Sequence, residues 1–231
     1  MKASPAVTDE ALFGGKPFAA FLFDMDGTIL SSIESAERVW SAWAVRHGLD
    51  VAAFLPTMHG RRAIDTVLLQ GLPGIDAEAE AAGILKAEID DVGGVHAIAG
   101  AVEFLASLPQ DRWAIVTSAS RSLALRRLEA AGLSHPTIFV TAEDITRGKP
   151  DPEGYLLAAA RLGFQARDCL VFEDAAAGIE AGERAGGSVL VIRATQTHKP
   201  TTSHVSVLDY AGLDAVADAT GALSLRFRSD P

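Results

Sequence analysis

Short runs of consecutive apolar residues alternate along the chain with longer segments whose apolar residues recur at helical spacing. An apolar run of about four to eight residues, bounded by turn residues, is typical of a strand buried on both faces. Such runs predict strands at Phe18–Phe23, Trp113–Val116, Thr137–Val140, Cys169–Phe172, Ser188–Ile192 and, less clearly, Val205–Leu208. Helical patterns lie between them at Gly100–Leu108, Arg121–Ala131, Pro152–Leu162 and Ala176–Ala185. The alternation predicts an α/β fold with a parallel sheet and helices on both faces.

The interval between the first two predicted strands is too long for a single crossover helix. It is mostly helical and lacks a convincing strand, and its helical pieces are Ile33–His47, Arg61–Leu69 and Ala77–Asp91. The segment opens on Ser31-Ser32-Ile33-Glu34, whose spacing is typical of a capping box, in which Ser31 would cap the helix. We therefore expect a small helical domain inserted into the core.

The patterns divide the chain into a loose N-terminal arm (1–17), a core domain (18–30 and 98–231) and a helical insert (31–97). The pattern beyond residue 219 is less clear, and Ala222–Phe227 is the best candidate for a last edge strand.

Composition limits the kinds of partner that the chain is suited to. The 231 residues are 48% hydrophobic, which is enough for a sizeable core. A net charge of −10 argues against nucleic acid or an anionic membrane as the main partner. The single cysteine, Cys169, excludes an internal disulfide. No apolar stretch approaches the roughly 20 residues of a membrane helix, and no signal-peptide pattern opens the chain. We expect a soluble, cytoplasmic monomer.

The first predicted strand ends in two acids, Asp24 and Asp26, followed by Gly27 and Thr28. Strand alternation returns Asp26 to the side of Asp24. Two carboxylates at the end of a central strand repel each other and resist burial. A hard divalent cation would remove both costs, and Mg²⁺ typically binds one or two carboxylates together with substrate phosphate. The alternative is an acidic turn without chemistry.

Three further strand ends carry polar groups at the edge of the sheet where ligands bind in open α/β folds. Thr117-Ser118-Ala119-Ser120 leads into a helix and is suited to cradle an anion, although serines there also serve as ordinary caps. Lys149 lies between a glycine and a proline, and Glu173-Asp174 is a second acid pair at a helix start. Taken together, the acids predict a Mg²⁺ site, and the hydroxyls and Lys149 predict a phosphoryl site facing Asp24.

This order of residues resembles the motif order of the haloacid dehalogenase superfamily over nearly the whole chain. Asp24-Met-Asp26-Gly27-Thr28 resembles its first motif, Thr117-Ser118 its second, Lys149 its third and Glu173-Asp174 its fourth. The insert is similar to the helical cap of the phosphoglycolate phosphatase and β-phosphoglucomutase branch, which implies a Rossmann-like core with a cap domain. Three segments look most like sugar- and polyol-phosphate phosphatases, such as the 2-deoxyglucose-6-phosphate and glycerol phosphatases: Met58–Asp65, Ile115–Ser118 and Val140–Glu143. Ser31 departs from the pattern, because many members carry an acid there.

The resemblance implies a Mg²⁺-dependent phosphatase acting on a small sugar or polyol phosphate. Asp24 would be the nucleophile that forms an aspartyl-phosphate, and Asp26 the general acid and then the general base. The Mg²⁺ ligands would be the Asp24 carboxylate, the Asp26 backbone carbonyl and Asp174, with Glu173 as an indirect partner. Lys149 would offset phosphate charge. Phosphoryl contacts would come from Thr117 or Ser118, with Ser118 favoured, and Ala119. The candidates for substrate contact from the cap are His59, Arg61 and Arg62, which otherwise are surface charge.

Several other activities fit the sequence less well. A β-phosphoglucomutase-like phosphomutase typically has a histidine about ten residues after the second acid of the first motif, where this chain has Ala36. A dehalogenase would not keep an acid at position 26, and a phosphonatase would need a cap lysine, for which Lys86 is the only candidate. A catalytically silent phosphate-binding protein is the non-enzyme alternative, but every catalytic position is filled. Hexose, pentose and glycerol phosphates all remain open as substrates.

Overall fold

Six strands form one parallel sheet in the computed structural model, which describes residues 11–196 and 203–227. The strands are β1 (Phe21–Phe23), β4 (Trp113–Val116), β5 (Ile138–Val140), β6 (Leu170–Glu173), β7 (Ser188–Ile192) and β8 (Val205–Val207). They lie in the order β5-β4-β1-β6-β7-β8, and every neighbouring pair is parallel. The predicted α/β fold is therefore confirmed, with β1 at the centre of the sheet.

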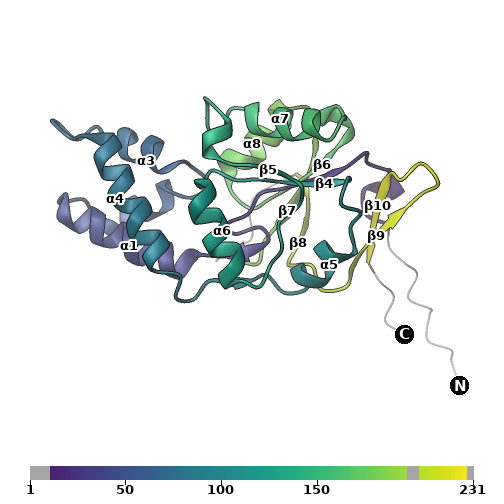
Figure 1. Cartoon of the computed structure of the whole chain (residues 1–231), viewed down its shortest axis with the longest axis horizontal. Coiled ribbons are helices and arrows are strands. Elements are labelled where there is room, and N and C mark those ends of the chain that lie inside the picture. The colour runs from purple at the N-terminus through teal and green to yellow at the C-terminus, as the bar shows by residue number, and fades with distance from the viewer. Residues whose placement is uncertain (1–10, 197–202, 228–231) are drawn as a thin grey trace, which may run out of the picture.

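Helices cover both faces of this sheet, as Figure 1 shows. Alternation along β1 sends Phe21 and Phe23 to one face and Leu22 to the other. The first face packs against α5 (Ala101–Ser107) and α6 (Arg121–Ala130), and the second against α7 (Glu153–Arg161) and α8 (Ala176–Arg184). Because β1 is buried on both faces, the residues that follow its carboxyl end lie at the edge of the sheet that carries the polar residues.

The segment between β1 and β4 forms a separate group of helices, at the left of Figure 1. These helices are α1 (Ile33–Arg46), α2 (Val51–Phe54), α3 (Ala63–Leu69) and α4 (Ala77–Asp90), with a 3₁₀ turn at Leu55–Thr57. They enclose a hydrophobic cluster of their own, which includes Trp40, Trp43 and Phe54. This separate cluster explains how a polar, alanine-rich segment is stable away from the sheet.

A two-stranded antiparallel ribbon joins the helices to the sheet. It consists of β2 (Leu30–Ser31) and β3 (His96–Ala97), and the predicted limits of the insert fall on it. Strands of two residues carry no periodic pattern, so the sequence did not predict them. The expected capping box was wrong: Ser31 lies in β2, and Ser32 is the N-cap residue without a side-chain cap. The Ser32 hydroxyl instead donates to Asp26 Oδ1 at 2.6 Å.

The C-terminal part of the described chain forms a hairpin of β9 (Leu213–Ala217) and β10 (Leu223–Phe227) beside the main sheet. The expected strand at Ala222–Phe227 therefore exists, but it pairs with β9, which the alanine-rich sequence did not predict. Residues 11–17 are not the loose arm that we expected. They form a 3₁₀ turn at Leu12–Gly15 next to β10. The side chains of Leu12 and Phe13 pack against the core and hold this segment in place. Residues 1–10 lie outside the described part.

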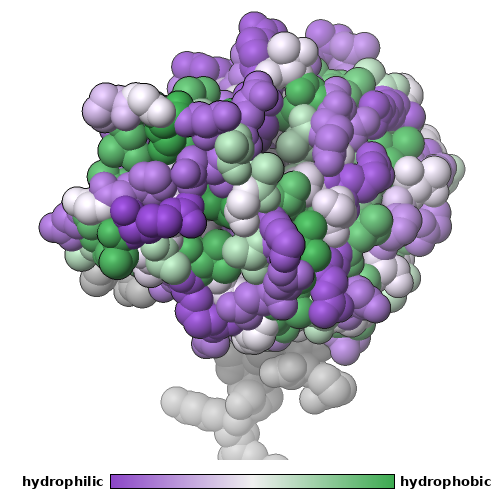
Figure 2. All heavy atoms as spheres, turned by 60° about the vertical axis from the view of Figure 1, so that its left-hand side comes forward, coloured by the Kyte–Doolittle hydropathy of each residue, from purple (hydrophilic) through white to green (hydrophobic). Residues whose placement is uncertain are grey.

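The surface on the side of α1 to α4 mixes hydrophilic and apolar residues (Figure 2). Its exposed apolar side chains include Val45, Leu68 and Leu69. Hydrophilic residues surround the apolar ones in this view, so this face carries no single large apolar area. Within residues 11–196 and 203–227, no helix is both long and apolar enough to span a bilayer.

Candidate active site

The predicted polar residues lie together beyond the carboxyl ends of β1, β4, β5 and β6. Asp24 directly follows β1, and its backbone N–H donates to the Phe172 carbonyl of β6 at 3.0 Å. The Lys149 ammonium contacts the carboxylates of Asp24 and Glu173, the latter at 2.6 Å. All three side chains are buried. The sheet thus brings three of the predicted motifs into direct contact.

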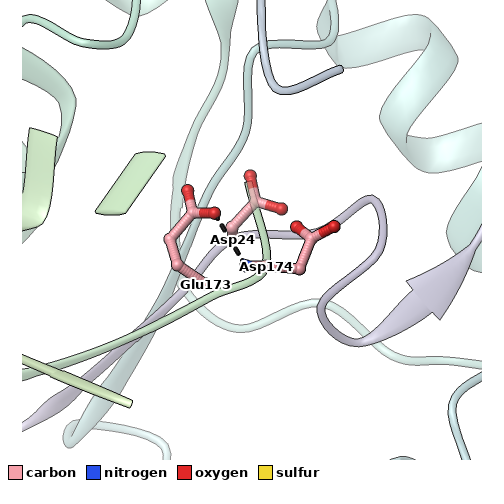
Figure 3. Close-up of side chains that lie close together, drawn as sticks. All are labelled: Asp24, Glu173 and Asp174. Atoms are coloured by element: carbon pink, nitrogen blue, oxygen red, sulfur yellow. Dashed lines mark hydrogen bonds between the residues drawn. The ribbon is translucent and has the colours of Figure 1, made fainter. Parts of the chain in front are cut away.

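Glu173 is held by donors on every side. Its Oε1 accepts hydrogen bonds from Lys149 and, at 2.8 Å, from the Tyr155 hydroxyl. Its Oε2 accepts from the backbone N–H group of Asp174 at 2.9 Å (Figure 3) and from that of Ala175 at 3.1 Å. The carboxylate therefore fixes both Lys149 and the start of α8. Tyr155 was missed because it lies at an apolar position of the α7 pattern, where an aromatic residue indicates core packing.

Asp24, Glu173 and Asp174 place carboxylate oxygens within 4.8 Å of one another, as a metal ion would require. Thr28 Oγ1 lies 3.2 Å from both Asp24 Oδ2 and Asp174 Oδ1, so it links the two carboxylates. Gly27 has a φ of 87°, and a Cβ there would lie 2.1 Å from Asp174 Oδ2. Only glycine therefore lets the loop after β1 approach Asp174 this closely.

The electrostatics of this cluster show an excess of negative charge. Burial raises the pKa of Asp24 to about 7; Lys149 works against the rise, and Glu173 adds to it. Burial, with Glu173 and Asp24 nearby, raises the pKa of Asp174 well above its usual range. Although burial alone would lower the pKa of Lys149, the two carboxylates raise it above its usual value. One ammonium does not balance three carboxylates, so the donor set fits a hard divalent cation such as Mg²⁺.

Asp26 does not join this cluster through its side chain. Its Oδ1 accepts hydrogen bonds from Ser32 at 2.6 Å and from Arg127 Nη1 at 2.9 Å. Arg127 Nη2 donates in turn to Glu88 Oε1 at 2.9 Å. Neither Arg127 nor Glu88 was among the predicted site residues. A signal existed for Arg127, since it continues the buried stripe of α6 formed by Leu123, Ala124 and Leu128.

A cavity of about 380 Å³ lies between this edge of the sheet and the helical group. All the predicted phosphoryl-binding and cap residues line it, together with both acids of the first motif: Asp24, Asp26, His59, Arg61, Arg62, Thr117, Ser118 and Ala119. Ala36, the position at which a phosphomutase typically has a histidine, also lies in its wall. The Thr117 hydroxyl accepts from the Ala119 N–H at 3.1 Å.

Besides the Arg127–Glu88 ion pair, two contacts connect the core and the helical insert at this cavity. The Ser118 hydroxyl donates to the Gly60 carbonyl at 3.0 Å. Arg62 forms a two-pronged ion pair with Asp65 and donates to the Thr146 carbonyl at 3.1 Å. Arg61 is exposed, and so is His59, which also borders a second cavity of about 700 Å³ that reaches Asp174. Desolvation lowers the pKa of His59 below its usual value, although the nearby Glu37 works against the fall.

Comparison with known proteins agrees with this geometry. The model of the haloacid dehalogenase-like hydrolases matches residues 18–186, and the chain belongs to this family of enzymes. Hexitol phosphatase A of Escherichia coli K12 is 42% identical over 178 residues, which are 75% of this chain and 82% of that protein. 2-Deoxyglucose-6-phosphate phosphatase 1 of Saccharomyces cerevisiae is 35% identical over 84% of this chain and 85% of its own length. A hydrolase from Pseudomonas syringae shares the fold, with a TM-score of 0.72 and 24% identity over 84% of this chain and 96% of its own.

Proposed function

We propose that this chain is a Mg²⁺-dependent phosphatase that hydrolyses the monophosphate ester of a small sugar or polyol through an aspartyl-phosphate on Asp24. The observation that carries the proposal is the buried Asp24 carboxylate, which faces a cavity of substrate size and contacts Lys149. The named activities of the similar proteins support a sugar or polyol phosphate as the substrate class.

The chemistry follows from the positions of the two acids. A carboxylate oxygen of Asp24 attacks phosphorus, and the ester P–O bond breaks with its electron pair going to the alkoxide. The protonated Asp26 carboxyl gives its proton to this leaving group. Water then attacks the phosphorus of the aspartyl-phosphate and gives a proton to Asp26. The bond to Asp24 breaks, inorganic phosphate leaves, and both carboxyl groups return to their first states.

Several residues would stabilise the negative charge of this reaction. Mg²⁺, held by the Asp24 carboxylate, Asp174 and the Asp26 backbone carbonyl, would offset the charge of the phosphoryl oxygens. Lys149 adds a fixed positive charge beside Asp24, and Glu173 holds that ammonium in place. Because donors occupy both Glu173 oxygens, we assign Glu173 an indirect part in metal binding.

We further propose that residues 31–97 act as a cap over the cavity. The Ser118 hydroxyl, which now contacts Gly60, would turn to a phosphoryl oxygen when substrate enters. His59 and Arg61 would face the sugar or polyol part of the substrate, because both are exposed in the cavity wall. Arg62 would mainly hold the cap against the core, since Asp65 and Thr146 already occupy its guanidinium.

The test is phosphate release from hexitol, 2-deoxyglucose and glycerol phosphates and from p-nitrophenyl phosphate, with Mg²⁺ and with a chelator. We expect turnover that requires Mg²⁺ and an inactive, folded Asp24→Asn variant. Asp111→Asn is the matched control, because the Asp111 side chain is 80% exposed. Full activity of Asp24→Asn would contradict the assignment of the nucleophile. Binding of a sugar phosphate without turnover of any ester would favour the catalytically silent binding protein.

A further inference from the structure

Arg127 is a buried cation that contacts two carboxylates from different parts of the fold. It lies on the core helix α6, and only 5% of the residue is exposed. One guanidinium nitrogen donates to Asp26 in the loop after β1, and another donates to Glu88 near the end of α4. The guanidinium therefore connects the core, the proposed proton donor and the helical insert.

Stability alone does not account for a charge at this position. Buried ion pairs are often no more stabilising than apolar residues of similar volume, because desolvation offsets their attraction. The neighbouring stripe positions Leu123, Ala124 and Leu128 are apolar, so an apolar side chain would suit the helix packing. Moreover, Arg127 Nε is buried and has no acceptor within the described residues. A group that is only partly satisfied at a cavity wall indicates a functional requirement for its charge.

The hydrogen bonds to Asp26 leave its two oxygens in different states. Oδ1 accepts from both Ser32 and Arg127. Within the part of the chain that the structure describes, no donor contacts Oδ2. The two donors on one oxygen fix the rotation of the carboxyl group, which leaves Oδ2 as the oxygen that can carry and exchange a proton.

The two hydrogen bonds that Asp26 accepts, from Ser32 and Arg127, also depend on the position of the helical insert. Ser32 directly follows the ribbon strand β2, where the insert begins, and Glu88 lies near the end of α4, shortly before the chain returns through β3. Glu88 is itself buried, and burial raises its pKa although the nearby Arg127 works against the rise. Movement of the helices away from the core would separate Glu88 from Arg127 and Ser32 from Asp26.

We propose that Arg127 is a positioning residue that holds the Asp26 carboxyl group in line for proton transfer only while Glu88 and the cap are seated against the core. This inference rests on the proposed phosphatase function. It adds a residue to the site that no motif of the sequence indicates, and it makes cap closure a condition for protonation of the leaving group.

The choice of leaving group separates this role from a structural one. Departure of an alkoxide needs a proton, whereas p-nitrophenolate leaves without one. The ratio kcat/KM reports only the steps up to the first irreversible one, so it reflects release of the alcohol and excludes the later hydrolysis of the aspartyl-phosphate. A misplaced Asp26 should therefore lower kcat/KM for glycerol 1-phosphate much more than for p-nitrophenyl phosphate.

The experiment compares kcat/KM for these two esters in the full chain with Mg²⁺. The double variant Arg127→Met/Glu88→Leu removes both buried charges of the Arg127–Glu88 pair. Asp26 loses Arg127 but is only partly buried and keeps the hydrogen bond from Ser32, so the fold is expected to persist. General acid catalysis contributes about 10²–10⁴-fold to the rate, and a misplaced Asp26 should lose part of this contribution. We therefore expect kcat/KM for glycerol 1-phosphate to fall about 10- to 100-fold. For p-nitrophenyl phosphate, kcat/KM should stay within about threefold of the wild-type value. The single variant Arg127→Lys keeps a positive charge, so its kcat/KM for glycerol 1-phosphate should fall less than that of the double variant. The control is Arg126→Met on the same helix, since the Arg126 side chain is 43% exposed.

Equal losses on the two esters, or no loss on either, would overturn the positioning role. A wild-type protein that releases phosphate from neither ester would instead contradict the proposed function, and the inference with it. The two failures are therefore distinguishable from the wild-type rates alone.

Discussion

The close packing of Gly178 against Glu173 makes a sharp prediction about stability. Gly178 is the third residue of α8, and a Cβ there would lie 1.6 Å from Glu173 Oε1. Four donors hold that carboxylate, so it cannot move aside without breaking contacts to Lys149 or Tyr155. Gly178→Ala should therefore strain the centre of the site, although alanine normally stabilises a helix.

The expected size follows from two opposing effects. Replacing glycine by alanine inside a helix gains about 1 kcal/mol. Overpacking a buried site costs about 1–3 kcal/mol, and breaking a buried ion pair costs about 3–5 kcal/mol. Partial displacement of Glu173 thus predicts a net loss of about 1–3 kcal/mol. For a chain of this size that loss lowers Tm by roughly 2 to 12 °C.

Thermal unfolding followed by circular dichroism tests this prediction, with phosphate release as a second measurement. The matched control is Gly83→Ala in α4, since Gly83 is exposed and a Cβ there would meet nothing within 4 Å. That variant should gain about 0.5–1 kcal/mol and keep its activity. If Gly178→Ala melts at or above the temperature of the wild type with full activity, the packing argument is refuted.

Four further predictions follow from the polar residues of the site. The folded-state pKa of Asp24, about 7, lies above the ordinary value of 3.8, so the metal-free protein should lose stability as pH rises from about 4 to 7. Mg²⁺ competes with protons for this carboxyl group, so the rise in Tm that Mg²⁺ causes should be larger at about pH 8 than at about pH 5.5, and Asp174→Asn should abolish it. His59→Ala should raise KM for the best sugar phosphate, and unchanged kinetics would remove His59 from the substrate site. Arg62→Ala should raise KM for every ester tested, because it frees the cap from the Thr146 carbonyl; a change confined to one substrate would instead indicate direct recognition.

The strand ends were predictable because their signal is local and the topology is general. Buried apolar runs located the strands, and parallel strands present their carboxyl ends at one edge of the sheet. The order of the motifs along the chain was therefore enough to predict that Asp24, Lys149 and Glu173 lie close together. In the structure, Lys149 contacts both carboxylates. Of the acid pair of the first motif, Asp24 contributes its side chain to the metal cluster, whereas the Asp26 side chain contacts Ser32 and Arg127, which the sequence did not indicate.

Contacts between distant helices were not predictable in the same way. Arg127 and Glu88 lie 39 residues apart on helices of different parts of the fold, and nothing in either helix pattern specifies the other. The strand β9 and the packing of residues 11–17 were missed for a related reason, because each depends on pairing with β10 and has little strand or helix propensity of its own. Ser32 has the right position and chemistry for a helix cap, but the nearby Asp26 carboxylate is the acceptor that it uses.

The pairing of the first and last described segments has a consequence for rearranging the chain. Phe18 and Leu223 exchange two backbone hydrogen bonds, and Ala11 pairs with Arg226. This junction lies on the opposite side of the sheet from α1 to α4 (Figure 1). Joining the two ends by a linker and opening the chain elsewhere is tolerated when the ends are neighbours on the surface. A circular permutant opened at the α3–α4 turn would make the polypeptide begin and end in the cap. A fluorophore at one of these new ends, paired with a second one on the core, would report the movement of the cap relative to the core.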